Sequence, residues 1–236
     1  MATIDCSDKT VRAVNSKLKD LVYDGESEIH IINPGSLHNL AVAITKAANI
    51  TIDGSVGYYC AGMIDSPNVR IKGSAGWGLA ESMLNGTVKV NGSAGNGAAA
   101  AIRGGTVIIE SDAAARVGVS MKGGLVLVGG NCGYMAGFMG QKGTLIVCGD
   151  TGAGFADSMY ETVCFVGGKI EELGTDAIIE VPTADDNSFL YSTLALHLPG
   201  KIEAPSFALD RFKKVMSGRK LWNFDNQDWK TWRGAM

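Results

Sequence analysis

Hydrophobic and polar positions repeat along this chain with a fixed period. Short runs in which β-branched and other apolar residues alternate with polar ones each end 19 residues after the previous run. The runs are NITIDG, NVRIKG, TVKVNG, TVIIES, LVLVGG, TLIVCG and VCFVGG, which end at Gly54, Gly73, Gly92, Ser111, Gly130, Gly149 and Gly168. A further run, IHIINPG, ends at Gly35, again 19 residues before Gly54. Alternation of this kind is typical of strands with one buried face, so we predict one strand per unit.

The length of the repeat unit excludes several folds. Nineteen residues cannot hold a strand together with a crossover helix, which excludes a βαβ repeat. Short identical units that stack their apolar faces form a solenoid. A left-handed hexapeptide solenoid would favour a multiple of six, and a calcium-binding nonapeptide solenoid needs a Gly/Asp motif that is absent here. We therefore predict an all-β solenoid, a right-handed parallel β-helix of about seven to eight coils over residues 31–168.

Other columns of the repeat hold small or flexible residues. Three residues beyond the strands come glycines, at Gly57, Gly76, Gly95, Gly133 and Gly152, with Ala114 in the remaining unit. Glycine is expected there because stacked turns need a positive φ or leave no room for a Cβ. A second column holds only alanine and glycine, at Ala61, Ala80, Ala99, Gly118, Gly137 and Ala156. Met83, Met121 and Met159 share a third column and are expected to fill the interior.

Both ends of a solenoid expose strand edges and core, so they need covers. We expect residues 1–30 to form an N-terminal helical cap, with Asp8 capping a helix that carries Val11, Val14 and Leu18 on one side. After Gly168 the period stops. Residues 169–236 are expected to form a C-terminal cap with helices at about 186–197 and 206–216, followed by an aromatic tail.

The outward column of the strands changes from polar to apolar along the stack. It contains Thr51, Arg70 and Lys89, followed by a large apolar stripe at Ile108, Leu127, Ile146 and Phe165. Water disfavours such a stripe, so either the C-terminal segment or a partner chain covers it, and we favour the C-terminal segment. The tail holds Trp222, Trp229 and Trp232. Tryptophans anchor interfaces, so these residues either dock a partner or pack on their own chain.

Composition and charge exclude several classes of function. The chain of 236 residues is 46% hydrophobic, contains 32 glycines and carries a net charge of −3. Such a chain can bury a core, and it lacks the basic surface expected of a nucleic-acid or anionic-membrane binder. It has no apolar run long enough for a membrane helix and no signal peptide, so a cytoplasmic location is expected. Five cysteines without a CxxC pair, far from the three histidines, predict buried thiols rather than disulfides or a metal site.

No catalytic group is evident in the sequence. The GSAGWG, GSAGNG and GDTGAG runs recur in register with the repeat, which indicates turns rather than a dinucleotide fingerprint. Glu81 and Asp157 share a column but lie four coils apart, about 19 Å, which is too far for paired carboxylate chemistry. We therefore predict no catalytic, cofactor-binding or metal-binding residue. From the residues alone, the chain is a rigid, partner-bound β-helix.

Several segments resemble a known family. They are NPGSLHNLAVAI (33–44), DGSVGYYCAGM (53–63), SAGWGLAESMLNGTVKVNG (74–92), ARVGVSMKGG (115–124), GDTGAGFADSMYE (149–161) and SGRKLWNF (217–224). They resemble the GXGXG β-helix family, which includes the C-terminal domain of the large subunit of glutamate synthase and a subunit of formylmethanofuran dehydrogenase. The similarity is greatest to the stand-alone members that form a subunit of N-methylglutamate synthases. The AAAAIRGG run at 98–105 departs from the family pattern.

The resemblance implies a subunit of a cytoplasmic three-subunit enzyme that forms N-methylglutamate and ammonia from methylamine and glutamate. One partner would be a glutamine amidotransferase-like subunit. The other would be an FMN-binding glutamate synthase-like subunit that also holds an iron–sulfur cluster. This chain would be a non-catalytic scaffold that spaces the two active sites and walls an ammonia or methylamine path. The alternatives are the equivalent subunit of a glutamate synthase or formylmethanofuran dehydrogenase, and a stand-alone interaction or carbohydrate-binding β-helix.

Overall fold

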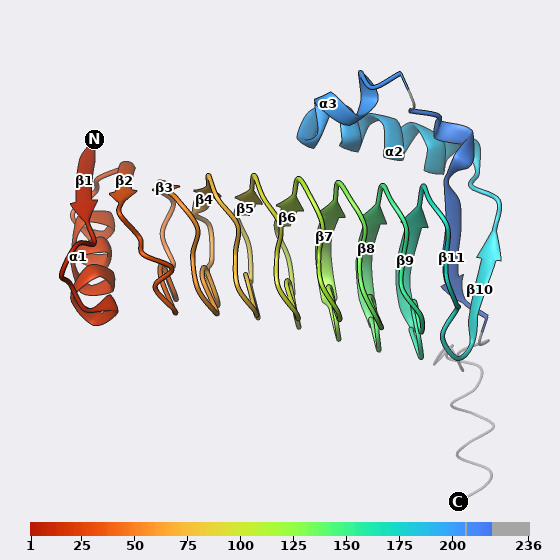
Figure 1. Cartoon of the computed structure of the whole chain (residues 1–236), viewed down its shortest axis with the longest axis horizontal. Coiled ribbons are helices and arrows are strands. Elements are labelled where there is room, and N and C mark those ends of the chain that lie inside the picture. The colour runs from red at the N-terminus through yellow and green to blue at the C-terminus, as the bar shows by residue number, and fades with distance from the viewer. Residues whose placement is uncertain (206, 219–236) are drawn as a thin grey trace, which may run out of the picture.

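The computed structural model describes residues 1–205 and 207–218, which wind into a parallel β-solenoid (Figure 1). One strand of each coil joins a single long sheet, in which consecutive strands pair in parallel from β2 to β9. These strands are β2 (Glu28–Ile32), β3 (Asn49–Asp53), β4 (Asn68–Ile71), β5 (Thr87–Val90), β6 (Thr106–Ile109), β7 (Lys122–Val128), β8 (Lys142–Val147) and β9 (Glu161–Val166). The predicted fold class is confirmed, while the right-handed winding of the coils stays a prediction.

The sheet register follows the sequence period, except at its start. From β3 to β9 the strands pair at intervals of 19 residues, as Ile50 does with Val69, except at the irregular start of β7, where Lys122 pairs with Lys142. Between β2 and β3 the interval is longer, because Ile29 pairs with Ile50. Gly35 and Gly54 are 19 residues apart in the sequence, but the strands of these two units pair at an interval of 21 residues. The first coil contains two extra residues, and they lie in the loop that follows β2.

The interior is filled as the alternation predicts. The inward residues of the strands are buried, and Met83, Met121 and Met159 lie beside them in the same core cluster. Ala98 and Ala99 of the alanine run are fully buried there as well. Both residues therefore belong to the close-packed interior.

The wall opposite the strands is built from residues with left-handed backbone. On this wall, three alternate positions in each coil have positive φ, as Tyr59, Ala61 and Met63 do with values between 54° and 58°. The middle position recurs in the column of small residues at Ala61, Ala80, Ala99, Gly118, Gly137 and Ala156. A left-handed conformation disfavours β-branched side chains, and complete burial of this column leaves room only for small ones, so the column contains only alanine and glycine.

The five predicted turn glycines have a different cause. Positive φ is not found at Gly57, Gly76, Gly95, Gly133 or Gly152. A Cβ on Gly76 would lie 2.8 Å from the carbonyl carbon of Gly57 in the preceding coil, and one on Gly152 would lie 2.9 Å from that of Gly133. Of the two reasons offered by the sequence, lack of space between stacked turns is therefore the correct one.

Side chains also join neighbouring coils at the turn after each strand. The Asn131 N–H donates to Asp112 Oδ1 at 2.7 Å, the Asp150 N–H to Asn131 Oδ1 at 2.8 Å, and the Lys169 N–H to Asp150 Oδ1 at 2.7 Å. Each side chain thus satisfies a backbone donor of the next coil, which the strand ladder leaves unpaired.

Removing one rung of this side-chain ladder should have a modest cost. We expect Asp150→Ala to lower the free energy of unfolding by about 1 kcal/mol, because the Lys169 N–H loses its acceptor but stays accessible to water. Asp150→Asn is the matched control, since an amide oxygen fills the same role at Asn131. Urea denaturation of both variants measures the difference. Equal losses in the two variants would contradict the assigned role.

The N-terminal cap contains a strand in addition to the predicted helix. β1 (Ala2–Asp5) pairs in parallel with β2 at the end of the sheet, and α1 (Val11–Tyr23) lies against the first coil (Figure 1). The helix begins after Thr10, whose side chain accepts from the Ala13 N–H, so the prediction that Asp8 is the N-cap is wrong. Asn15 donates to the Asn39 carbonyl at 2.7 Å and accepts from the Ala41 N–H at 2.9 Å. It therefore satisfies backbone groups that have no preceding coil to pair with.

The C-terminal cap combines a strand pair with a helical strap. β10 (Ala177–Glu180) and β11 (Lys213–Ser217) extend the sheet beyond β9 in the order β9-β11-β10, both in antiparallel pairing. We call residues 184–205 and 207–212 the strap. They contain α2 (Ala184–His197), α3 (Pro199–Ile202) and η1 (Leu209–Arg211). The predicted helix at 186–197 is confirmed. The predicted helix at 206–216 is wrong, because its described residues form η1 and β11.

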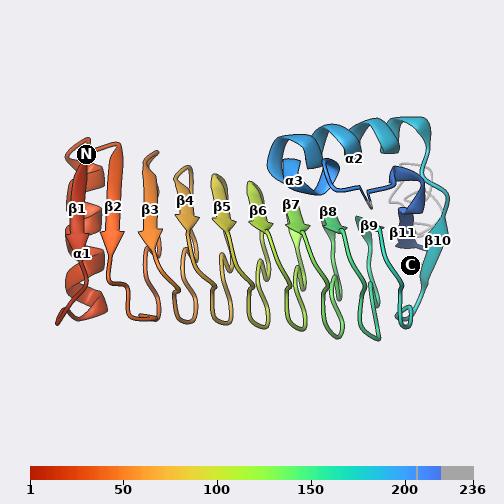
Figure 2. The same cartoon turned by 45° about the horizontal axis from the view of Figure 1, so that its top comes forward.

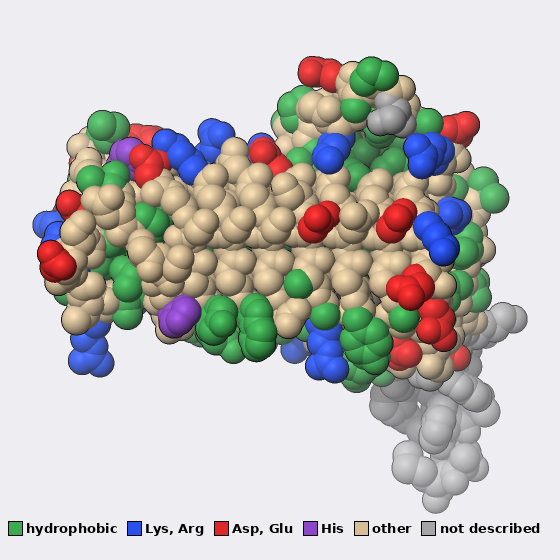
Figure 3. All heavy atoms as spheres, viewed as in Figure 1, with side chains coloured by type: hydrophobic (Ala, Val, Ile, Leu, Met, Phe, Trp, Pro, Cys, Tyr) green, Lys and Arg blue, Asp and Glu red, His purple; other side chains and the backbone are tan. Residues whose placement is uncertain are grey.

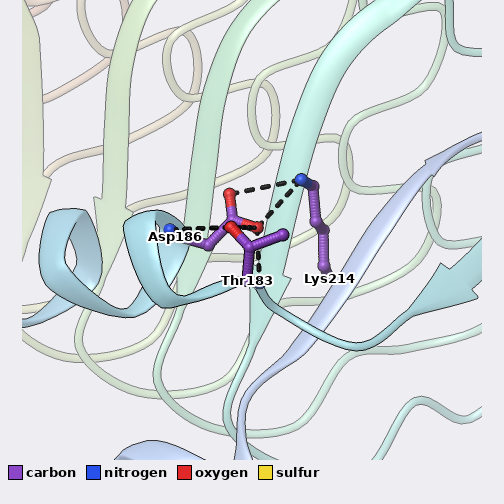
Figure 4. A network of polar contacts seen from close by, with 3 residues as sticks. All are labelled: Thr183, Asp186 and Lys214. Atoms are coloured by element: carbon purple, nitrogen blue, oxygen red, sulfur yellow. Dashed lines mark hydrogen bonds and ion pairs between the residues drawn. The ribbon is translucent and has the colours of Figure 1, made fainter.

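A polar network fixes the strap to the sheet. Asp186 accepts from the Thr183 N–H at 2.8 Å, and the Asp186 N–H donates to Thr183 Oγ1 at 3.1 Å, which is a capping box at the start of α2 (Figure 4). Lys214 of β11 donates to the same carboxylate at 3.0 and 3.2 Å. Burial alone would raise the pKa of Asp186, but the Thr183 N–H and Lys214 hold it below its ordinary value.

Candidate functional site

The apolar stripe is covered by its own chain. Ile108, Leu127, Ile146 and Phe165 form a second core cluster with Leu190, Leu194, Leu198 and Phe212. The strap that carries these partners lies over the C-terminal half of the stack (Figure 2). The expectation that the C-terminal segment covers the stripe is confirmed. The alternative of a partner interface at these four positions is wrong for this structure, because their side chains are at most 2% exposed.

The other predicted site residues divide into two groups. The turn glycines take part in coil stacking, as described above. Trp222, Trp229 and Trp232 lie outside the described residues, so their docking on a partner stays a prediction.

The cysteine thiols are unreactive. All five cysteines are free, and four of them are buried. Burial raises the pKa of Cys60 and of Cys132 to about 12 and shifts that of Cys164 higher still. Burial also raises the pKa of Cys148 to about 11, although Lys201 opposes the shift. These thiols are protonated at neutral pH and are therefore poor nucleophiles.

Each histidine has a structural contact. His30 Nε2 lies 2.6 Å from Asp53 Oδ2, and Lys72 Nζ lies 2.5 Å from the other oxygen of that carboxylate. His197 lies near Lys89, and burial, followed by that positive charge, lowers its pKa. Among residues 1–205 and 207–218, no group of three or more His, Cys, Asp or Glu is placed to hold a metal ion.

The carboxylates Glu81 and Asp157 stay apart, as their spacing in the sequence predicts. Both occupy the same column, where their backbone carbonyls accept from the Met63 and Met139 N–H groups. Asp157 accepts from Ser158 Oγ at 2.6 Å and from the Thr175 N–H at 3.0 Å. Its carboxylate therefore links the last turn of the solenoid to the segment that follows it. Glu81 instead lies in a surface cleft, described below.

A pocket lies under the strap. It has a volume of about 300 Å³ and is walled by Phe207 and Phe212, with Cys148 and Lys201 among its polar groups. Three glycines that follow β7, β8 and β9, namely Gly129, Gly149 and Gly167, also line it. The pocket thus has the Lys201 cation and the protonated Cys148 thiol in one lining.

A row of stacked rings is the feature that the sequence analysis missed. His38 and Tyr58 stack with centroids 4.5 Å apart and planes 13° apart, and Tyr58 stacks on Trp77 at 5.4 Å and 23°. The Tyr58 N–H donates to His38 Nδ1 at 2.8 Å, which fixes the first pair. We call these three residues the aromatic ladder. Tyr58 and Trp77 are 19 residues apart, so the repeat itself could have revealed their pairing.

A cleft adjoins the aromatic ladder. It has a volume of about 270 Å³ and spans three consecutive coils. Its lining residues are Asn39, Val42, Tyr59, Gly62, Met63, Glu81 and Ser82. Tyr59 is positioned by Gly78 of the next coil, where a Cβ would lie 2.6 Å from Cε1 of the ring. The cleft thus combines apolar walls, one exposed ring and one carboxylate.

Comparison with known proteins gives a partial similarity. No family model matches the chain. A segment of 67 residues is 39% identical to protein GlxC of Rhizobium meliloti (strain 1021), and it spans 28% of this chain and 29% of GlxC. The chain is thus similar to less than a third of that relative. Among the described residues, no helix has the length and hydropathy needed to cross a membrane.

Proposed function

We propose that this chain is the non-catalytic β-solenoid subunit of a glutamate-synthase-like enzyme, and specifically of an N-methylglutamate synthase. The observation that carries the proposal is the solenoid of 19-residue coils with glycine-stacked turns, which is the architecture that the GXGXG resemblance implies. The partial similarity to GlxC supports a relationship between the matched segment of this chain and that protein. In this proposal the enzyme is cytoplasmic, and FMN and the iron–sulfur cluster belong to the glutamate synthase-like partner.

The geometry suits a spacer between two active sites. Parallel pairing continues without a break from β2 to β9, and at about 4.8 Å per strand this sheet is roughly 34 Å long. Every coil is tied to the next by the strand ladder, and a second line of bridges runs from Val56 through Ala75 and Ala94 to Ile170. An element connected on two sides resists bending, so it can hold two partner subunits at a constant separation.

One alternative from the sequence is disfavoured by the ring geometry. A carbohydrate-binding β-helix would present free aromatic faces on which sugar rings could stack. In the aromatic ladder, both faces of Tyr58 are covered, by His38 on one side and Trp77 on the other. The Tyr58 ring therefore offers no free face to a sugar, which favours contact with a protein surface over carbohydrate binding at this residue.

Purification of the tagged full-length chain from its source cells, grown on methylamine, tests the proposal. We expect an assembly with the absorption of a flavin that converts methylamine and glutamate to N-methylglutamate and ammonia, measured by mass spectrometry. The chain purified alone should show no turnover. A colourless lone chain, or turnover by the isolated chain, would refute the proposal. Formation of glutamate from glutamine and 2-oxoglutarate would indicate the glutamate synthase form instead.

A further inference from the structure

Exposed apolar side chains gather around the cleft. Tyr58, Tyr59, Met63 and Trp77 are between 42% and 54% exposed, although all four are large and apolar. They lie on consecutive coils, and Figure 3 shows hydrophobic side chains gathered beside a histidine at the lower edge of the solenoid, below β3 to β5. A contiguous patch of this kind on a soluble domain marks an interaction site.

The carboxylate in the cleft has no partner within the described chain. Glu81 lines the cleft, and its side chain forms neither a hydrogen bond nor an ion pair with residues 1–205 or 207–218. Its neighbours in the cleft wall include Val42, Tyr59 and Met63, which offer no positive charge. A carboxylate between apolar walls is stabilised by a cation, and a neighbouring ring strengthens the attraction.

We propose that the cleft and the aromatic ladder form the docking surface for another subunit of the assembly, which inserts an arginine or lysine side chain between Tyr59, Met63 and Glu81. The apolar stem of the inserted side chain would lie against Tyr59 and Met63, and its charge would meet the Glu81 carboxylate. This inference rests on the proposed function only in that the occupant is a partner subunit.

Size and position favour a protein over other occupants. The cleft alone could hold a small amine, but the exposed rings continue past it to Trp77 on the adjacent column, so a broader surface is available for contact. The strap is excluded, because it lies over the other half of the stack (Figure 1). Interfaces commonly centre on an arginine anchor surrounded by aromatic residues, which is the complement of this surface.

Charge reversal in the purified assembly tests the inference. We expect Glu81→Lys to weaken binding of the partner at least about tenfold, measured by titration of the chain against the partner subunit, because two cations would meet in the cleft. Glu172→Lys is the matched control, since it makes the same charge change at an exposed position in the column of Tyr58 and Trp77, six units further along. The melting temperature of the isolated Glu81→Lys chain should equal that of the wild type, as the Glu81 side chain has no internal partner.

A photo-crosslinking residue in place of Met63 identifies the occupant. The inference expects a crosslink to a partner segment that contains arginine or lysine. A crosslink to residues 219–236 of this chain, to a second copy or to nothing overturns it, as does unchanged binding by Glu81→Lys. If the wild-type chain purifies alone, the proposed function fails as well. If the assembly forms normally with Glu81→Lys, only the docking surface fails.

Discussion

Ile146→Asp should detach the strap and lower the melting temperature by roughly 10 °C. Ile146 is fully buried between Leu127 and Phe165, in the cluster that the strap closes with Leu190 and Leu194. An aspartate there would have no cation and no hydrogen-bond donor among these apolar side chains. Burial of an unpaired charge costs at least about 4 kcal/mol, which places this substitution among the most destabilising single changes.

The control for this experiment lies in the same outward column of the sheet. Thr51 pairs with Arg70 across adjacent strands, is half-buried and lies outside the strap, so Thr51→Asp should leave the melting temperature nearly unchanged. Circular dichroism gives both melting temperatures, and limited proteolysis reports whether the strap becomes accessible. A wild-type melting curve with a protected strap in Ile146→Asp would show that packing of the strap on the apolar stripe is not needed for stability.

The repeat made the body of the fold predictable. A period of 19 residues repeated without insertion fixes which residues stack, and alternation within each run fixes which of them face inward. Met83 and Met121 could therefore be assigned to the interior from their spacing, and both are fully buried. The boundary of the N-terminal cap was less exact, because β2 begins at Glu28 and belongs to the sheet.

The C-terminal cap was predicted only in part, because its structure depends on the end of the sheet. Leu209, Phe212 and Val215 have helical spacing, yet Val215 lies in β11 opposite Cys164 of β9. The end of a parallel stack leaves a row of unpaired N–H and C=O groups, and satisfying them outweighs local helix preference. That demand arises from the stacked structure and leaves no sign in the segment itself.

The candidate docking surface was missed for a related reason. Tyr58 and Trp77 share a column, but turn residues do not alternate between two faces as strand residues do. The direction of their side chains therefore depends on the backbone of the turn, in which the neighbouring Tyr59 is left-handed with φ 58°. Glu81 was considered only as a possible partner of Asp157, and the cleft around it exists only once three coils are stacked.

The left-handed wall leads to the other large expected effect. Ala99 is fully buried and has φ 57°. Valine at this position would adopt a backbone that β-branched residues avoid and would add two methyl groups to a filled core. Together these effects should lower the free energy of unfolding by about 3 kcal/mol or more.

Ala98→Val separates the two causes. Ala98 is also fully buried, but it lies outside the left-handed positions, and its column already accepts Val117 in the next coil. Ala98→Val should therefore lower the free energy of unfolding only by the smaller cost of added volume, about 1 kcal/mol. Urea denaturation of both variants measures the difference. If Ala98→Val were as damaging as Ala99→Val, tight packing alone would explain the column of small residues. A clear excess for Ala99→Val would instead show that the left-handed backbone selects alanine and glycine on this wall.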